Sequence, residues 1–190
     1  MRTFLLALAL VGLQAAAQAE MRHFRFVGTV AQSLPMAPAG AKVSGRFSYN
    51  TATAPSLSVG EPSGDGYGLA TYAVPRRMTM SVNGHRLAAS AMQVEVTNNT
   101  GGNVEDAVSV YGTPMTLDGT LFPEGLFGLF LASGPGQTQV LRSTRLPWRL
   151  NVAPFDGMNY GVVQVNGSAD GTWLVFAIDS IVTADDRDED

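Results

Sequence analysis

The fold is decided by one stretch, Met78-Thr79-Met80-Ser81-Val82-Asn83-Gly84-His85-Arg86-Leu87-Ala88-Ala89. The Asn-Gly pair at its centre favours a two-residue type I′ turn, whose left-handed backbone matches the twist of the flanking strands. That turn pairs the strands so that one face is apolar and the other carries Thr79, Ser81, Arg86 and Ala88. The expected pairs are Val82 with His85, Met80 with Leu87, and Met78 with Ala89. The stretch therefore predicts an antiparallel β-hairpin.

Period-two alternation continues on both sides of this hairpin. In residues 42–49, Val43, Phe47 and Tyr49 alternate with polar residues, which places one face on a core and the other in water. Residues 172–178 are apolar on both faces, so we expect a central strand there, joined to its predecessor by the turn formers at 166–171. Further strands are predicted at 24–30, 92–97, 107–111, 126–131, 148–152 and 160–165. Longer connections are expected at 32–41, 52–66, 98–105, 113–125 and 133–139.

The whole pattern predicts an all-β protein, because the apolar spacing typical of helices is nearly absent. About nine or ten short strands with frequent turn residues favour an antiparallel two-layer β-sandwich or jelly roll. No charge break, linker or internal repeat divides the chain. We therefore expect residues 20–184 to form a single β-sandwich domain.

Residues 1–19 have the order of a secretory signal peptide. A basic start at Met1-Arg2 is followed by an apolar stretch from Phe4 to Leu13 and by Ala17-Gln18-Ala19. This order predicts cleavage before Glu20 and a secreted or periplasmic protein; an uncleaved membrane anchor is the alternative. No later segment offers about 18 unbroken apolar residues, so no transmembrane segment is expected after cleavage.

Composition narrows the classes of partner. The chain contains no cysteine, so neither disulfides nor a cysteine-linked lipid are available. Its net charge is −4, and segment 185–190, with five acids and one arginine, contributes −4 by itself. Loss of Arg2 with the signal changes −4 to −5 and leaves the body at −1, without the basic stripe that nucleic acid requires. We expect segment 185–190 to be a disordered acidic tail, with calcium or partner binding as the alternative.

Three segments resemble a family of exported bacterial proteins, many of which carry a PEP-CTERM sorting tail. Residues 43–51, Val-Ser-Gly-Arg-Phe-Ser-Tyr-Asn-Thr, are similar to the Gly-x-Phe-x-Tyr-Asp-Thr segment of that family, although Asn50 replaces its aspartate. Residues 78–84 and 94–98 resemble the strands that follow it. The residues after Ile181 contain no Pro-Glu-Pro motif. The resemblance implies an exported β-sandwich associated with surface or matrix material, and it implies no catalytic residue.

Catalytic constellations are missing from the sequence. The two histidines, His23 and His85, have no ligand-spaced companion, and no Gly-x-Ser-x-Gly segment marks a serine nucleophile. Isolated acids are usually solvated surface groups, and sequence spacing cannot pair them across a cleft. We therefore expect neither a cofactor nor an enzymatic activity; a carbohydrate-active hydrolase is the alternative.

Residues 98–106 combine oxygen-bearing side chains with two glycines. Calcium accepts six to eight oxygen ligands, and Asn98, Asn103 and Asp106 are the candidates for such a site. The same composition is typical of a tight turn, which we favour over a metal site.

Trp148 is the main candidate for ligand binding. It lies between Arg145 and Arg149, so an exposed indole could stack on the apolar face of a sugar beside polar donors. Tyr67, Tyr72 and Tyr160 could extend this platform, although packing in the core is the alternative for each ring. The sequence thus favours an exported structural or binding module of the cell exterior, with polysaccharide or surface matrix as the partner.

Overall fold

The computed structural model describes residues 20–60, 66–99, 106–137, 139–166 and 171–184. These residues form thirteen strands and no α-helix, which confirms the all-β prediction. No helix among them has the length and hydropathy needed to cross a membrane.

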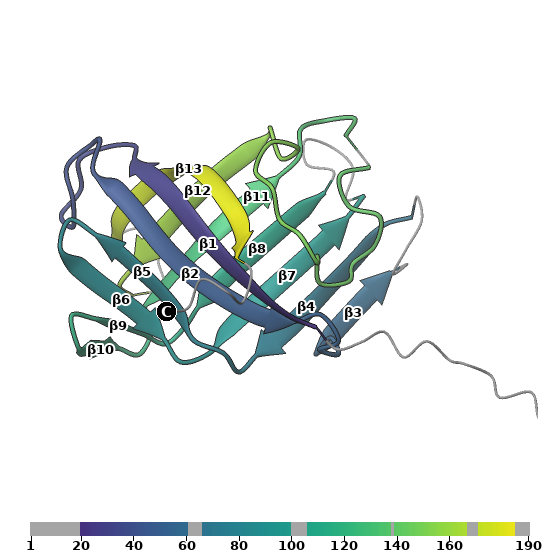
Figure 1. Cartoon of the computed structure of the whole chain (residues 1–190), viewed down its shortest axis with the longest axis horizontal. Coiled ribbons are helices and arrows are strands. Elements are labelled where there is room, and N and C mark those ends of the chain that lie inside the picture. The colour runs from purple at the N-terminus through teal and green to yellow at the C-terminus, as the bar shows by residue number, and fades with distance from the viewer. Residues whose placement is uncertain (1–19, 61–65, 100–105, 138, 167–170, 185–190) are drawn as a thin grey trace, which may run out of the picture.

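All thirteen strands belong to one sheet, in the order β10-β9-β6-β5-β2-β1-β13-β12-β11-β8-β7-β4-β3 (Figure 1). Every neighbouring pair is antiparallel. The strands are β1 (Met21–Val30), β2 (Lys42–Asn50), β3 (Leu57–Gly60), β4 (Gly68–Val74), β5 (Met78–Val82), β6 (His85–Ala89), β7 (Met92–Asn98), β8 (Ala107–Gly112), β9 (Met115–Leu117), β10 (Thr120–Phe122), β11 (Leu126–Ala132), β12 (Met158–Gln164) and β13 (Thr172–Ala184).

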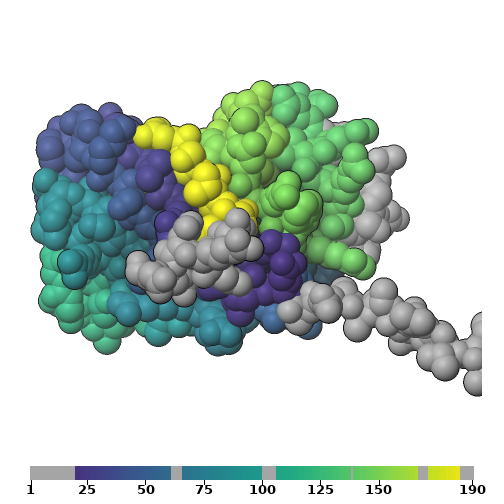
Figure 2. Space-filling model, viewed as in Figure 1, coloured from purple at the N-terminus to yellow at the C-terminus, as the bar shows by residue number. Residues whose placement is uncertain are grey.

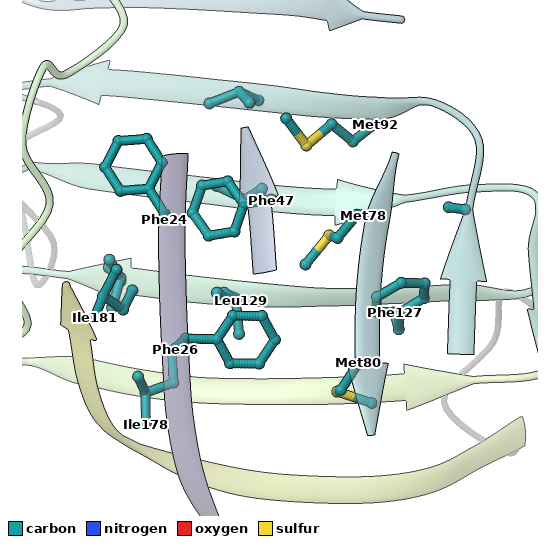
Figure 3. Close-up of a cluster of buried hydrophobic side chains, with 14 of the residues drawn as sticks. Phe24, Phe26, Phe47, Met78, Met80, Met92, Phe127, Leu129, Ile178 and Ile181 are labelled. Carbon is teal, nitrogen blue, oxygen red and sulfur yellow. The ribbon is translucent and has the colours of Figure 1, made fainter. Parts of the chain in front are cut away.

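The sheet curls around one hydrophobic core. In Figure 3, β1, β2 and β5 cross in front of strands that carry Met92, Phe127 and Leu129, and the labelled side chains gather between them. All of these side chains belong to a single cluster of buried residues. The antiparallel class is therefore as predicted, but its form is a curled half-barrel. One continuous ladder, in which β13 pairs with both β1 and β12, replaces the two separate sheets of a sandwich.

The central hairpin has the predicted register. Val82 pairs with His85, Met80 with Leu87 and Met78 with Ala89. The turn residues Asn83 and Gly84 have φ angles of 48° and 84°, as a type I′ turn requires. The strand predicted to be central is also confirmed, because β13 is the seventh of the thirteen strands and pairs with β12 as a hairpin.

Gly84→Val is expected to lower the free energy of unfolding by about 1 kcal/mol or more, because a β-branched residue resists the positive φ of this turn. The denaturant midpoint measures the loss. Gly84→Asn is the matched control, since asparagine adopts the left-handed conformation at less cost. Equal midpoints for the wild type and Gly84→Val would contradict this account of the turn.

Several sequence predictions need correction. Residues 113–125 contain the hairpin of β9 and β10, and residues 52–66 contain β3, although both segments were expected to be loops. The turn between β9 and β10 uses Asp118 and Gly119 at φ 49° and 88°, the same left-handed chemistry as the first hairpin. Strand β4 was also not predicted, because its first residues lack regular alternation.

The strand predicted at 148–152 is wrong, since this segment has no strand structure. It belongs to a long connection from β11 to β12 whose Leu146, Leu150 and Phe155 join the core. Two buried tyrosines hold this connection: the Tyr49 hydroxyl donates to the Pro147 carbonyl at 2.6 Å, and the Tyr72 hydroxyl donates to the Thr144 carbonyl at 2.7 Å. Leu150 is therefore apolar because this loop packs on the core, and not because the segment forms a strand.

Candidate functional site

The outer face of β1, β2, β5 and β6 carries rows of polar side chains. This half of the sheet faces the viewer in Figures 1 and 2, where β1 (purple) and β13 (yellow) run side by side. The first row runs across the strands from Arg25 through Arg46, Thr79 and Ala88 to Thr116 of β9. The adjacent row runs from Val27 through Ser44 and Ser81 to Arg86.

A groove of about 650 Å³ lies over these rows. Five of its lining residues have short side chains, Ser44, Thr79, Ser81, Ala88 and Thr116. Because these residues are small, the sheet surface is hollow there. Four of the five carry a hydroxyl group, which can donate or accept a hydrogen bond.

The groove is also lined by four exposed arginines, Arg25, Arg46, Arg77 and Arg86. The described residues that line the groove include no aspartate or glutamate. Arg25 and Arg46 are paired directly across β1 and β2, so two guanidinium groups lie on neighbouring strands of this face. Guanidinium groups bind carboxylate and sulfate anions through planar N–H donors.

Asp118 supports one end of the groove. Its carboxylate lies 2.7 Å from His85 Nδ1 and accepts the Arg86 backbone N–H at 2.8 Å. The hydrogen bond with His85, followed by that from Arg86, lowers the pKa of Asp118. This carboxylate is therefore already engaged in joining the β9–β10 turn to β6, beside the groove residue Gly119.

Trp148 is exposed, as the stacking hypothesis requires, with 56% of its surface accessible. Its ring is already in contact with cations. The Arg149 guanidinium carbon lies 4.2 Å from the ring centroid, and that of Arg22 lies 5.8 Å away. A sugar that stacked on the indole would have to compete with these cation–π contacts.

The three tyrosines occupy different settings. Tyr67 is exposed, whereas Tyr72 is only 4% exposed and its hydroxyl binds Thr144. Tyr160 stacks on Phe130, with their centroids 5.1 Å apart. Among the ring contacts of the described residues, none joins Trp148 to a tyrosine. The structure therefore provides no stacking contact between Trp148 and these three rings.

The calcium candidates lie at a buried polar junction. Asp106 is fully buried, and its two carboxylate oxygens accept backbone N–H groups from Asn99 at 3.0 Å and Leu141 at 2.8 Å. Its own backbone N–H donates to the Ser133 hydroxyl at 2.9 Å. Asn98 is also buried, and Asn103 lies outside the described residues. In the described part of the chain, no group of three His, Cys, Asp or Glu residues could hold a metal ion.

Sequence reasoning missed the arginine groove, although one signal for it was available. Alternation already placed Arg46 and Arg86 on the polar faces of their strands, but it did not show that these strands are neighbours. That adjacency comes from the pairing of β2 with β5. No family model, no curated protein and no solved structure matches this chain.

Proposed function

We propose that this protein is an exported binding module for acidic polysaccharide, which it holds in the arginine groove. The observation that carries the proposal is that Arg25, Arg46, Arg77 and Arg86 line one groove together with four residues that carry hydroxyl groups. Export rests on residues 1–19, and the resemblance to exported surface proteins agrees with it.

The groove matches the chemistry of a chain of charged sugars. A guanidinium group presents N–H donors in a planar fork that fits a carboxylate or sulfate. The Ser44, Thr79, Ser81 and Thr116 hydroxyls suit the hydroxyl groups of the sugar rings. Each exposed charge contact adds little by itself, so affinity must come from several arginines that act together on one polymer.

The test is the binding of alginate, dextran sulfate and neutral dextran to the mature protein. We expect Arg46→Gln/Arg77→Gln to weaken binding of the acidic polymer by about 5-fold or more, since each of the two lost contacts costs about 0.5–1.5 kcal/mol. Added salt should weaken wild-type binding. Alginate and dextran sulfate distinguish a carboxylate from a sulfate ligand.

The matched control is Arg76→Gln/Arg142→Gln, which removes the same charge from two exposed arginines that do not line the groove. Its binding should stay close to that of the wild type. Trp148→Ala should have a smaller effect than the groove variant, because Arg149 already contacts the indole ring. Equal losses in the groove and control variants, or equal binding of neutral dextran, would refute the proposal.

The same samples separate a binding module from a hydrolase. A glycosidase requires two carboxyl groups about 5–10 Å apart around the scissile bond. We expect bound alginate to be retained without release of reducing ends. Release of reducing ends by the wild type would instead support the carbohydrate-active hydrolase.

A further inference from the structure

A row of four side chains crosses the outer face of β7, β8, β11 and β12, on strands that do not line the arginine groove. Glu95 of β7 pairs with Ser109 of β8. Phe130 of β11 pairs with Ser109 on one side and with Tyr160 of β12 on the other. Glu95, Ser109 and Phe130 are partly exposed, and each lies between two buried residues, which places them on the outer face. Tyr160 lies on the same face because its ring stacks on that of Phe130.

The ring of Phe130 has one face that no other ring covers. Phe130 and Tyr160 are stacked, with 20° between the ring planes and 5.1 Å between the centroids. Among the described residues, this is the only ring contact of Phe130. Because Tyr160 covers the β12 side of the ring, the second face is directed toward β8, above the short side chain of Ser109. The face of an aromatic ring carries the negative part of its quadrupole.

A carboxylate lies on the other side of Ser109. The backbones of Glu95 and Phe130 are two strand spacings apart, about 10 Å, with Ser109 between them. Glu95 belongs to none of the ion pairs that join described residues. Burial, followed by the charge of Glu95, raises the pKa of the Tyr111 hydroxyl on the same face of β8. The ring face and the carboxylate therefore both direct negative charge toward the position above Ser109.

These charges favour a small organic cation as the ligand. A cation is attracted to an aromatic face when it lies within about 6 Å of the ring centroid, and a carboxylate attracts it as well. Atoms in contact are separated by about 4 Å, so the two strand spacings leave room for a cation between the ring and the carboxylate. A second copy of the chain fits less well, because two-fold packing of this face would bury two Glu95 carboxylates without a cation.

We infer that the outer face of β7, β8 and β11 binds an organic cation of the alkylammonium class above Ser109, between the Phe130 ring and the Glu95 carboxylate. This inference goes beyond the proposed function and does not rest on it. A choline headgroup and a lysine side chain both carry such a cation. The quaternary ammonium group of choline is the better fit to a ring face, since recognition of such groups commonly uses aromatic side chains.

The test is an NMR titration of the mature protein with choline at constant ionic strength. We expect choline to shift the backbone amide signals of Ser109 and Phe130 with a Kd in the millimolar range. Dimethylbutanol, the carbon analogue of choline, has the same shape without the charge and should bind about 5-fold more weakly or less. A parallel titration with N-acetyl-lysine amide distinguishes the two sources of the cation, and binding of either cation in preference to dimethylbutanol supports the inference.

Glu95→Gln and Phe130→Leu should each weaken choline binding by about 2- to 5-fold, since each removes one of the two contacts. Phe130→Tyr keeps the ring and should retain the affinity. Glu124→Gln is the matched charge control, because Glu124 is an exposed glutamate outside these strands. Its affinity for choline should equal that of the wild type.

The outcomes separate this inference from the proposed function. Equal binding of choline and dimethylbutanol, or wild-type affinity in both Glu95→Gln and Phe130→Leu, would overturn the inference. Shifts caused by N-acetylglucosamine but not by choline would overturn it in favour of a neutral sugar. Choline binding that is unchanged in Arg46→Gln/Arg77→Gln would support a site separate from the groove. Choline binding by a protein that does not bind alginate would support this inference and overturn the proposed function alone.

Discussion

Asp106→Ala is expected to lower the free energy of unfolding by about 2 kcal/mol or more, since the fully buried Asp106 carboxylate is the acceptor of two part-buried N–H groups and each group left without an acceptor costs about 1–3 kcal/mol. These groups are the backbone N–H of Asn99 and that of Leu141, which donate to separate oxygens of the Asp106 carboxylate. One buried side chain thus connects the end of β7 with the connection that follows β11. Chemical denaturation monitored by tryptophan fluorescence would measure the loss.

Asp156→Ala is the matched control for this prediction. The Asp156 carboxylate also accepts two hydrogen bonds, from the Gly134 N–H at 3.1 Å and the Gln137 side chain at 2.8 Å, but it is exposed. Because water can replace it, its removal should cost much less. Equal losses for the two variants would show that burial of Asp106 is not decisive. A large fall in the wild-type midpoint with EGTA, reversed by calcium alone, would show that this region holds calcium.

Gly45→Val is expected to lower the free energy of unfolding by about 1–3 kcal/mol or more, because it adds side-chain atoms to a filled core. Gly45 lies on the core side of β2, between Val43 and Phe47. A Cβ atom there would lie 2.5 Å from the Thr79 carbonyl oxygen and would overlap the ring of Phe26. Neither can move easily, since Thr79 belongs to the paired strand β5 and Phe26 packs against Phe176.

The neighbouring residue offers the control for Gly45. Ser44 lies on the same strand but faces outward and is exposed, so Ser44→Val should change the denaturant midpoint little. A double-mutant cycle tests the proposed clash directly. Gly45→Ala should cost less in a Phe26→Leu background, because the smaller side chain leaves room for the added methyl group. Equal costs in both backgrounds would show that Phe26 is not the obstacle.

The sequence identified candidate functional residues but did not show which of them are exposed. An exposed Trp148 was a requirement of the stacking hypothesis and is present, whereas Tyr72 is in the core because its strand faces inward at that position. The carboxylate of Asp106, a candidate calcium ligand, accepts hydrogen bonds from the backbone in the folded chain. Composition identified residues with suitable chemistry, but burial decided which of them are accessible.

Local sequence was sufficient to predict the central hairpin and the two faces of its strands. The type I′ turn at Asn83 and Gly84 determines the register of β5 and β6, and alternation determines that Arg86 faces outward. These features depend on residues close together in the chain, so their physical causes are visible in the sequence. The same reasoning identified the central strand β13 from its two apolar faces.

Only the tertiary structure decided which strands are neighbours, and therefore where the arginines meet. Arg25 and Arg46 face each other through the pairing of β1 with β2. Arg86 lies on the same face because β2 pairs with β5, and β5 pairs with β6, which carries Arg86. Likewise, β13 returns from the far end of the described chain to pair with β1, which makes a late segment of the chain a central strand of the sheet. Such pairings depend on how the whole sheet buries its core, and no short stretch of sequence specifies them.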